Sequence, residues 1–258
     1  MSSAPVNFSP VRPNPDVAFN IVHADSDLLL VDKPAGLVTQ PGLGHTQDTL
    51  LNGLFSKYGP QLKNLGVRRD WGLLHRLDKI TSGLLLVGLM PAAYDALRDD
   101  FQNRRIEKEY LAIVQGTPDP AQGVIQARLK EIHTGVKKVI VSRSGQEALS
   151  AYRTLAVSGR SALVAVNIKT GRLHQIRAHM MFLGTPLVGE DIYTLQEKPP
   201  AGKRTEHKPA ARIYLHSWRL GFKHPTEKKW REFVQPPPAD FIAAAKRLGL
   251  DVSSILAQ

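Results

Sequence analysis

The sequence predicts an α+β protein built on a mixed, mostly antiparallel sheet that is flanked by helices. Segments with alternating or β-branched apolar residues recur along the chain and crowd its second half. Helical segments stand between them, but without the regular strand–helix alternation that marks a parallel α/β sheet. A length of 258 residues and an apolar content of 42% are enough for a substantial core in one large or two small domains.

The first elements are predicted to be two short strands. Residues 19–23 and 28–32 are rich in apolar or β-branched side chains and enclose a turn of small polar residues. The second strand is expected to end at Pro34 and Gly36, because proline lacks the N–H donor that a strand needs and glycine permits the bend.

A helix and a buried strand are expected next. Residues 49–58 should form a helix with Asp48 as its N-cap. Residues 84–89 are almost continuously apolar, as is typical of a strand buried on both faces. Pro91 fits the first turn of a helix that runs to about Asn103, because the first turn needs no N–H donor.

The second half is expected to be rich in strands. Alternation or β-branched bias places them at residues 106–115, 124–129, 148–157, 162–168, 213–222 and 230–234. Helices are predicted over 173–183 and, closing the chain, over 239–248. These elements predict a single domain over 19–258, preceded by a flexible arm over 1–18 that is rich in proline, serine and asparagine. A second loose segment, 197–204, is basic and is either a solvated loop or an RNA contact.

The net charge of +11 is unevenly distributed. Residues 1–100 carry 9 Lys and Arg against 10 Asp, whereas residues 101–258 carry 25 Lys and Arg against 13 Asp and Glu. This asymmetry is typical of a protein that docks one face on a polyanion, although many proteins are simply basic. The absence of cysteine excludes disulfides, thiolate metal sites and cysteine nucleophiles. No segment resembles a signal peptide or a membrane span, so we expect a soluble, cytoplasmic protein.

The most informative feature of the chain is the segment HRLDKITSG at residues 75–83. It places the carboxylate of Asp78 two residues after Arg76, in a turn of small polar residues that leads into the apolar strand. An acid, a guanidinium and an apolar wall together are the means by which proteins tune carboxylate reactivity. The alternative is that Asp78 only closes the turn before Thr81 and Ser82.

Five segments in order carry a resemblance to a known family. They are DKPAG at 32–36, HRLD and TSG within 75–83, KEYLAIVQG at 108–116, TGRLHQIRAH at 170–179, and GTPLVG at 184–189 with LHS at 215–217. The set resembles the RluA family of RNA pseudouridine synthases over residues 19–238. Ile80 and Leu173 depart from the residues usual in that family, but neither is assigned to the chemistry. Many relatives begin with an S4-like RNA-binding domain that this sequence lacks, so we expect the catalytic domain alone to hold RNA.

The resemblance implies isomerisation of uridine to pseudouridine in structured RNA, either rRNA or tRNA. The reaction needs no redox change or external group, so no cofactor is expected. Asp78 is implied to be the essential acid, acting as a nucleophile or as a base. Arg177 is implied to keep this carboxylate ionised, because a guanidinium fork matches both of its oxygens. Tyr110 is implied to stack on the everted uracil, although an aromatic residue on a strand is otherwise typical of a core.

Three further residues are interpreted as RNA contacts. Arg76 is expected to contact a phosphate or to fill the space that a flipped base leaves, with a surface ion pair as the alternative. Arg172 and His174 are the candidates in the TGRLHQIR segment, and a local hydrogen bond is the alternative for His174. His174 and His179 are five residues apart, which does not place two imidazoles on one helical face, and no acid cluster accompanies them. We therefore expect no metal site.

Two other functions fit parts of the sequence. A non-catalytic RNA-binding or ribosome-assembly factor on the same scaffold would use the basic half equally well. A nucleoside hydrolase would use Asp78 but would need no large basic surface. Retention of Asp78, Tyr110 and Arg177 together favours the synthase. We expect a monomer whose partner is a stem-loop of structured RNA.

Overall fold

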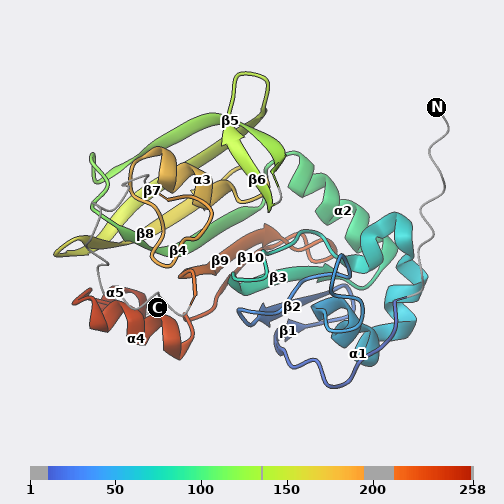
Figure 1. The fold of residues 1–258 in the computed structure, drawn as a ribbon. Helices are drawn as coiled ribbons and strands as arrows, with labels where there is room; N and C mark the ends of the chain where they lie inside the picture. The colour runs from blue at the N-terminus through green and yellow to red at the C-terminus, as the bar shows by residue number, and fades with distance from the viewer. Residues whose placement is uncertain (1–10, 135, 195–211, 257–258) are drawn as a thin grey trace.

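The computed structural model describes residues 11–134, 136–194 and 212–256 of the chain. These residues form one ten-stranded sheet in the order β1-β2-β3-β9-β4-β8-β7-β5-β6, with β10 paired to β9 (Figure 1). Within the described residues β3 and β9 run parallel, and the other paired strands are antiparallel. This architecture confirms the predicted α+β class.

The first half of the chain contains β1 (Asn20–Ala24), β2 (Leu28–Lys33), α1 (Leu50–Leu65), the 3-10 helix η1 (Val67–Gly72), β3 (Ser82–Gly88) and α2 (Pro91–Gln102). The second half contains β4 (Glu107–Gln115), β5 (Gln122–Thr134), β6 (Val136–Val141), β7 (Gln146–Ser158), β8 (Ser161–Ile168), α3 (Gln175–Phe182), β9 (Leu215–Lys223), β10 (Trp230–Val234), α4 (Ala239–Arg247) and α5 (Ser253–Leu256). All of the predicted elements are present. The structure also contains η1, β6 and α5, which the sequence does not predict. None of the helices in the described part of the chain is both long and apolar enough to cross a membrane.

The N-terminus of α1 differs from the prediction. Asp48 is not the N-cap, because its carboxylate lies 2.6 Å from Nδ1 of His45. Thr49 occupies the N-cap instead, and its backbone N–H donates to Oδ1 of Asn52 at 3.1 Å. The helix therefore begins one residue later than Asp48 would have set it.

Two helix boundaries are governed by the backbone. α1 continues to Leu65, past a kink at Tyr58 that precedes Pro60, whereas the sequence predicts that the helix ends at the kink. α3 begins at Gln175 rather than at 173, because His174 adopts the left-handed conformation with φ of 48°. A non-glycine residue in that region is uncommon and cannot continue a right-handed helix.

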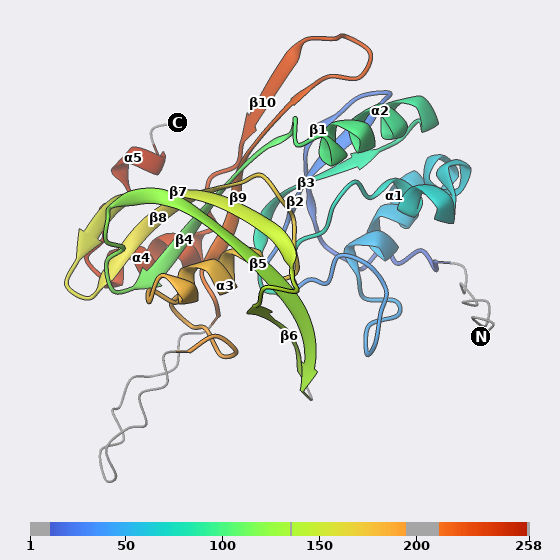
Figure 2. The same ribbon diagram turned by 90° about the horizontal axis from the view of Figure 1, so that it is seen from above.

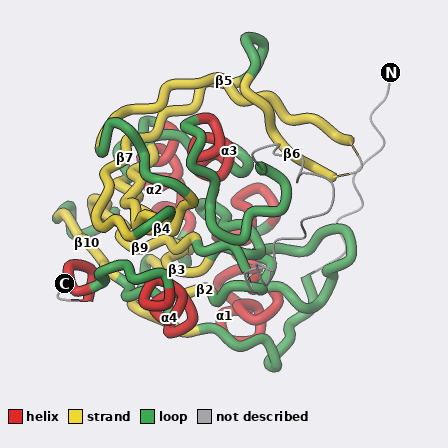
Figure 3. Tube along the Cα trace, turned by 60° about the vertical axis from the view of Figure 1, so that its left-hand side comes forward, coloured by secondary structure: helices red, strands yellow, loops and turns green. Residues whose placement is uncertain are grey.

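The two faces of β4 belong to different cores. Tyr110 and Ala112 face the larger cluster, which also contains residues from α1, α2 and α3. Leu111 and Ile113 face a second cluster together with Phe241 of α4. Alternate side chains of a strand point to opposite faces of the sheet, so α3 and α4 lie on opposite sides, as Figure 3 shows.

The β5–β7 end of the sheet extends as a long curved ribbon. Figure 2 shows the hairpin of β5 and β6 projecting beyond the neighbouring strands. α3 contacts β5, β6 and β7, so the helix is held at this end of the sheet while α2 packs on β3 at the other. The space between these two ends is where the predicted site residues gather.

The described part of the predicted arm lies against α1. Nδ2 of Asn52 donates to the carbonyl of Arg12 at 2.7 Å, and the N–H of Asn14 donates to the carbonyl of Asn52 at 3.0 Å. Residues 11–18 are thus tied to the domain by hydrogen bonds. Residues 1–10 and the predicted loose segment 197–204 lie outside the described residues.

The parallel contact between β3 and β9 joins the two halves of the sheet. Ser82 lies opposite His216, and Gly83 lies opposite Ser217. Gly83 has φ of 107°, and a Cβ added to it would lie 2.2 Å from the carbonyl oxygen of Ser217. Only glycine accepts both the backbone conformation and the close approach. This contact brings the segment 75–81, which precedes β3, beside β4 and β9.

We expect Gly83→Ala to lower the free energy of unfolding by more than about 2 kcal/mol, because the added carbon would overlap a backbone carbonyl at a positive φ. Gly159→Ala is the matched control. Its φ is also positive, at 54°, but nothing lies within 4 Å of the added carbon. The control should lose only the conformational cost of about 1 kcal/mol. Urea unfolding of both variants measures the difference, and equal losses would contradict the close approach.

Candidate active site

A cavity of about 550 Å³ opens where segments distant in sequence meet. Its walls come from the loop before β3, from β4, from the start of β9 and from the turn that leads into α3. The structure brings to this cavity all six residues that the sequence singles out: Arg76, Asp78, Tyr110, Arg172, His174 and Arg177. Leu215 also lines it and supplies an apolar part of the wall.

The loop that carries Asp78 is fixed through its backbone. Oγ1 of Thr39 donates to the carbonyl of Leu77 at 2.7 Å. The N–H of Gly36 donates to the carbonyl of Lys79 at 2.7 Å. The segment after β2 therefore holds the residue on each side of Asp78, which preorganises the position of its carboxylate.

Lys33 adds a buried cation beneath the same loop. Its Nζ donates to the carbonyls of Pro34 and Leu37 at 2.9 and 2.8 Å and reaches the carbonyl of Lys79 at 3.4 Å. Burial lowers the pKa of Lys33 to about 7, although the negative charge of Asp78 acts in the opposite direction. This side chain connects the DKPAG turn to the loop and explains why a lysine stands at the end of β2.

The carboxylate of Asp78 is not used to close the turn. The N–H of Thr81 donates to the backbone carbonyl of Asp78 at 3.0 Å, so the main chain makes the turn by itself. Within the described part of the chain no hydrogen bond engages the carboxylate, and its side chain is 21% exposed. Nε2 of His174 lies 3.8 Å from Oδ2 of Asp78. The carboxylate is thus free to meet a molecule bound in the cavity.

Arg177 does not offer its fork to Asp78, which corrects the pairing that the sequence suggests. Its Nε and Nη2 donate to the two carboxylate oxygens of Glu190 at 2.8 and 2.5 Å, and Nη2 also lies 3.3 Å from Asp191. Burial alone would lower the pKa of Arg177, but Glu190 reverses this and the pKa is raised. The same bonds hold the pKa of Glu190 below its ordinary value despite burial. The sequence prediction fails because the acid 13 residues downstream lies nearer the fork.

Tyr193 connects this buried ion pair to the edge of the cavity. The guanidinium of Arg177 lies over its ring at 5.3 Å, and its hydroxyl lies 3.0 Å from Nδ1 of His174. The hydroxyl also accepts the N–H of Val139 at 2.9 Å. His174, in its left-handed conformation, is therefore held with Nδ1 toward Tyr193 and Nε2 toward Asp78. Burial is the main cause that lowers the pKa of His174.

Tyr110 lies on the cavity face of β4, beside a bulge in the pairing with β9. The register changes between Glu109, which faces Arg219, and Tyr110, which faces Ser217. The extra residue is Trp218 on β9, whereas β4 keeps a regular register with β8, so the alternation of the β4 side chains is undisturbed. Burial raises the pKa of Tyr110 to about 12, so its phenol stays protonated near neutral pH. The side chain is 5% exposed and offers the cavity an aromatic surface.

Arg76 and Arg172 lie at the mouth of the cavity. Both are exposed, and Nε of Arg172 donates to the carbonyl of Glu147 at 3.0 Å, which orients the guanidinium. The turn that carries Arg172 is closed by Gln175, whose Oε1 accepts from Thr170 Oγ1 at 2.7 Å and from the N–H of Arg172 at 3.1 Å. The polar residues of the TGRLHQIR segment thus explain the local fold before α3.

The histidines that suggest a metal site have separate partners. Nδ1 of His179 lies 2.9 Å from Oγ of Ser150, inside the core, whereas His174 contacts Tyr193 and Asp78. The two rings do not converge on one point.

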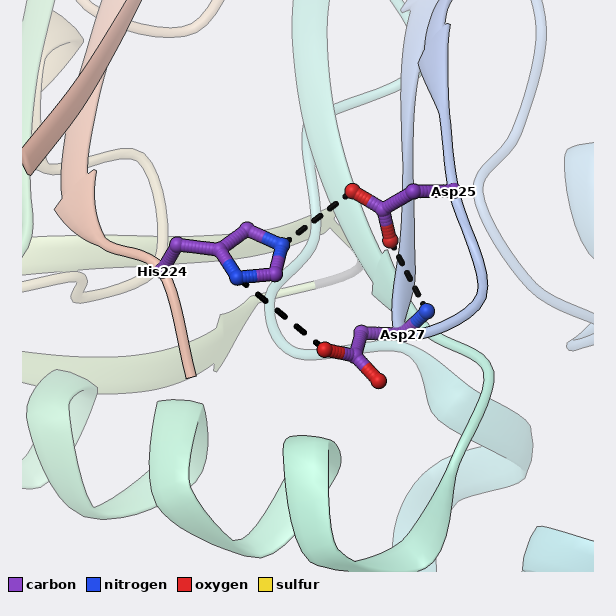
Figure 4. Close-up of side chains that lie close together, drawn as sticks. All are labelled: Asp25, Asp27 and His224. Atoms are coloured by element: carbon purple, nitrogen blue, oxygen red, sulfur yellow. Dashed lines mark hydrogen bonds and ion pairs between the residues drawn. The ribbon is translucent and has the colours of Figure 1, made fainter. Parts of the chain in front are cut away.

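A different group, Asp25, Asp27 and His224, does bring three ligand atoms together (Figure 4). Oδ1 of Asp25 accepts the backbone N–H of Asp27 at 2.8 Å, and Oδ2 lies 3.1 Å from Nε2 of His224. Nδ1 of His224 accepts the N–H of Glu227 at 3.2 Å. These hydrogen bonds account for the cluster as a joint between the β1–β2 turn and the segment after β9.

Sequence reasoning misses Lys33, Thr39, Glu190 and Tyr193. Glu190 follows directly after the GTPLVG segment, and Tyr193 lies three residues further on. An acid and an aromatic residue this close to a recognised motif could have indicated a role in the site. Thr39 has no such signal, because its role depends on a hydrogen bond to a residue 38 positions away.

Comparison with known proteins places the chain in a family. The family model for RNA pseudouridylate synthases matches residues 27–181. The chain belongs to this family. The match confirms the resemblance to RluA-type synthases, which are isomerases.

Relatives and solved structures agree with this assignment. The chain is 39% identical over 217 residues to a protein named an uncharacterized RNA pseudouridine synthase from Chloroflexus aurantiacus, a match that covers 84% of this chain and 65% of that protein. It is 33% identical over 240 residues to the ribosomal large subunit pseudouridine synthase D of Haemophilus ducreyi, covering 92% of this chain and 72% of that protein. The fold is similar to human RNA pseudouridylate synthase domain containing 4, with a TM-score of 0.69 and 25% identity over 90% of this chain and 94% of that one.

We expect His216, a buried residue that follows the cavity residue Leu215 on β9, to make a pH-dependent contribution to stability. Its Nδ1 lies 2.9 Å from Ser82 Oγ and its Nε2 2.8 Å from the carbonyl of Gln235, a pattern that suits the neutral ring. Burial lowers the pKa of His216 to about 4, from 6.5 in the unfolded chain. Between these two values the unfolded chain binds a proton that the folded protein does not.

The free energy of unfolding should therefore fall as the pH is lowered from about 6.5 to about 4. We expect His216→Gln to remove up to about 3 kcal/mol of that dependence. Urea unfolding at about pH 7 and about pH 4.5 measures it. His75 and His179, also buried, stay in both proteins as a common background. An identical pH dependence in the variant would contradict the assignment.

Proposed function

We propose that this protein converts specific uridines of structured RNA to pseudouridine, with Asp78 as the essential acid. The observation that carries the proposal is the free carboxylate of Asp78 in a cavity that Tyr110 and several cationic side chains also line. Membership of the pseudouridylate synthase family supports it. The substrate is proposed to be rRNA or tRNA, in keeping with the ribosomal large subunit named for the Haemophilus ducreyi relative.

The cavity suits a nucleotide that has left its helix. A uracil inside a duplex is unreachable, so the nucleotide must be flipped out and held. Tyr110 would stack on the base, and such stacking contributes about 1–3 kcal/mol toward the cost of unstacking. Arg76 would contact a phosphate or occupy the place of the everted base, and Arg172 and His174 would contact the RNA backbone at the mouth.

The proposed reaction moves the uracil from one glycosidic bond to another. The bond from uracil N1 to ribose C1′ breaks, the base turns, and C5 becomes joined to C1′. The proton lost from C5 is balanced by the one gained at N1, so the product is an isomer of the substrate. Asp78 would either attack the nucleoside or remove a proton, and both routes need an ionised carboxylate without an internal partner.

Arg177 would act on Asp78 through its neighbours rather than by direct pairing. Its fork is occupied by Glu190, and its guanidinium lies over the ring of Tyr193, whose hydroxyl contacts His174 beside Asp78. We therefore propose Arg177 as the residue that holds Tyr193 and His174 at the cavity wall. The cytoplasmic location and the monomeric state stay predictions from the sequence.

We expect Asp78→Asn to lower pseudouridine formation by at least about 100-fold, because the amide can neither attack nor accept a proton as the carboxylate does. Purified protein would be incubated with cellular RNA and the new pseudouridines mapped by sequencing. Asp95→Asn is the matched control. Asp95 is an exposed aspartate on α2 that pairs with Arg69, so this variant should keep full activity.

No gain of pseudouridine at any site with the folded wild-type protein would contradict the proposal. RNA binding that is unchanged in Asp78→Asn, together with no modification by the wild type, would favour the non-catalytic RNA-binding alternative.

A further inference from the structure

A second charged group in the cavity has no ion-pair partner in the described part of the chain. Lys108 is 7% exposed and lines the same cavity as Asp78. Among the described residues its ammonium makes no hydrogen bond and no ion pair within the distances that define them. The ammonium lies over the face of the Phe101 ring, whose centroid is 5.4 Å from Nζ.

This arrangement is costly unless an anion completes it. Removing an ammonium from water is expensive, and contact with an aromatic face repays less than an ion pair would. Lys33, by contrast, is a buried lysine whose Nζ is hydrogen-bonded to three carbonyl oxygens. Burial and the like charge of Lys169 lower the pKa of Lys108 to about 8, a shift that a bound anion would oppose.

The groups around Lys108 are cationic or neutral. Arg98, Arg104 and Lys169 line the same cavity, and the charge of Lys169 acts on Lys108. Burial lowers the pKa of His75 to about 3, and its Nε2 accepts the N–H of Leu86, so this ring is neutral.

The carboxylates that line the cavity are Asp78 and Glu131. Glu131 already pairs with Lys137 at 3.1 Å. Asp78 is the group assigned to the reaction. Neither acid is therefore available to neutralise the ammonium of Lys108.

The register of β4 sets the position of this charge relative to the base site. Lys108 and Tyr110 are two residues apart, so their side chains leave the same face of the strand about 7 Å apart along it. Arg76, which stands two residues before Asp78, and Arg172 are further cations of the cavity wall. A chain of alternating base and phosphate that enters the cavity would meet an aromatic ring at one point of β4 and an ammonium at the next.

We propose that Lys108 forms the floor of a phosphate subsite, which binds a backbone phosphate next to the everted uridine. That the ligand is a polynucleotide follows from the proposed function, on which this inference rests. It adds a determinant of substrate class, because a free nucleoside would leave the ammonium unpaired. Lys108 is thereby a binding residue and takes no part in bond rearrangement.

The test compares the salt dependence of RNA binding by wild type, Lys108→Met, Lys108→Arg and Lys246→Met. The probe is a labelled single-stranded RNA, and binding is followed by fluorescence anisotropy over a range of salt concentrations. Each phosphate neutralised by the protein contributes about 0.7 to the slope of log affinity against log salt. We expect Lys108→Met to lose about 0.7 of slope and Lys108→Arg to keep it. Lys246 is exposed on α4, outside the cavity lining, so Lys246→Met should keep it as well.

Thermal unfolding of the same proteins separates binding from structure. Methionine matches the length of the lysine stem and carries no charge, so Lys108→Met should melt at the same temperature as wild type or higher. A folded Lys108→Met protein with the wild-type slope would overturn the proposal. If this variant does not fold, the deciding measurement is the Lys108 pKa of the wild type, followed through its Cε chemical shift. An excess of inorganic phosphate should raise it relative to chloride at equal ionic strength, and an unchanged value would overturn the proposal.

The binding measurement is independent of catalysis. If wild type forms no pseudouridine but the slope falls in Lys108→Met, the proposed function fails and the phosphate subsite stands. If pseudouridine forms and the slope is unchanged, the subsite fails and the proposed function stands.

Discussion

The parallel contact between β3 and β9 is the constraint on which the arrangement of the site depends. Gly83 lets the two strands approach so closely that no side chain fits between its Cα and the carbonyl of Ser217. The segment before β3 carries Asp78, and β9 also pairs with the strand that carries Tyr110. The first half of the chain folds as hairpins, and the second half folds as a long antiparallel ribbon. The contact between β3 and β9 therefore lets residues of both halves line one cavity. Without that contact the acid and the aromatic ring would belong to separate sheets.

The charged groups in and next to the cavity are of two kinds, those with partners within the protein and those without. Arg177 is bonded through Nε and Nη2 to Glu190, and Lys33 is bonded to three carbonyls, so both serve to hold their surroundings in place. The carboxylate of Asp78 and the ammonium of Lys108 have no such bonds among the described residues. Charged groups with little exposure are normally paired, so the unpaired ones are where we expect a ligand. The paired groups shape the cavity, and the unpaired groups face its interior.

The sequence predicts the parts of this protein that depend on neighbours along the chain. Periodicity finds the strands, and the order of the short motifs finds the family and the residues that share the cavity. It does not find the partner of Arg177, because a fork can be satisfied by any acid that the fold brings near. It also misplaces the start of α3, since nothing in the neighbouring residues indicates the left-handed backbone of His174, whose ring contacts the distant residues Tyr193 and Asp78. β6 escapes prediction because its lysines, Lys137 and Lys138, interrupt the apolar pattern of a strand.

The central claim is that one cavity, at the junction of the two halves of the sheet, receives a nucleotide of RNA. Ultraviolet crosslinking of the wild-type protein to RNA, followed by mass spectrometry of the crosslinked peptides, tests it most directly. The account predicts that crosslinked peptides come from the cavity walls, above all from β4 around Tyr110 and from the turn that carries Arg172. Crosslinks confined to α4 and α5, on the opposite side of the sheet, would contradict it.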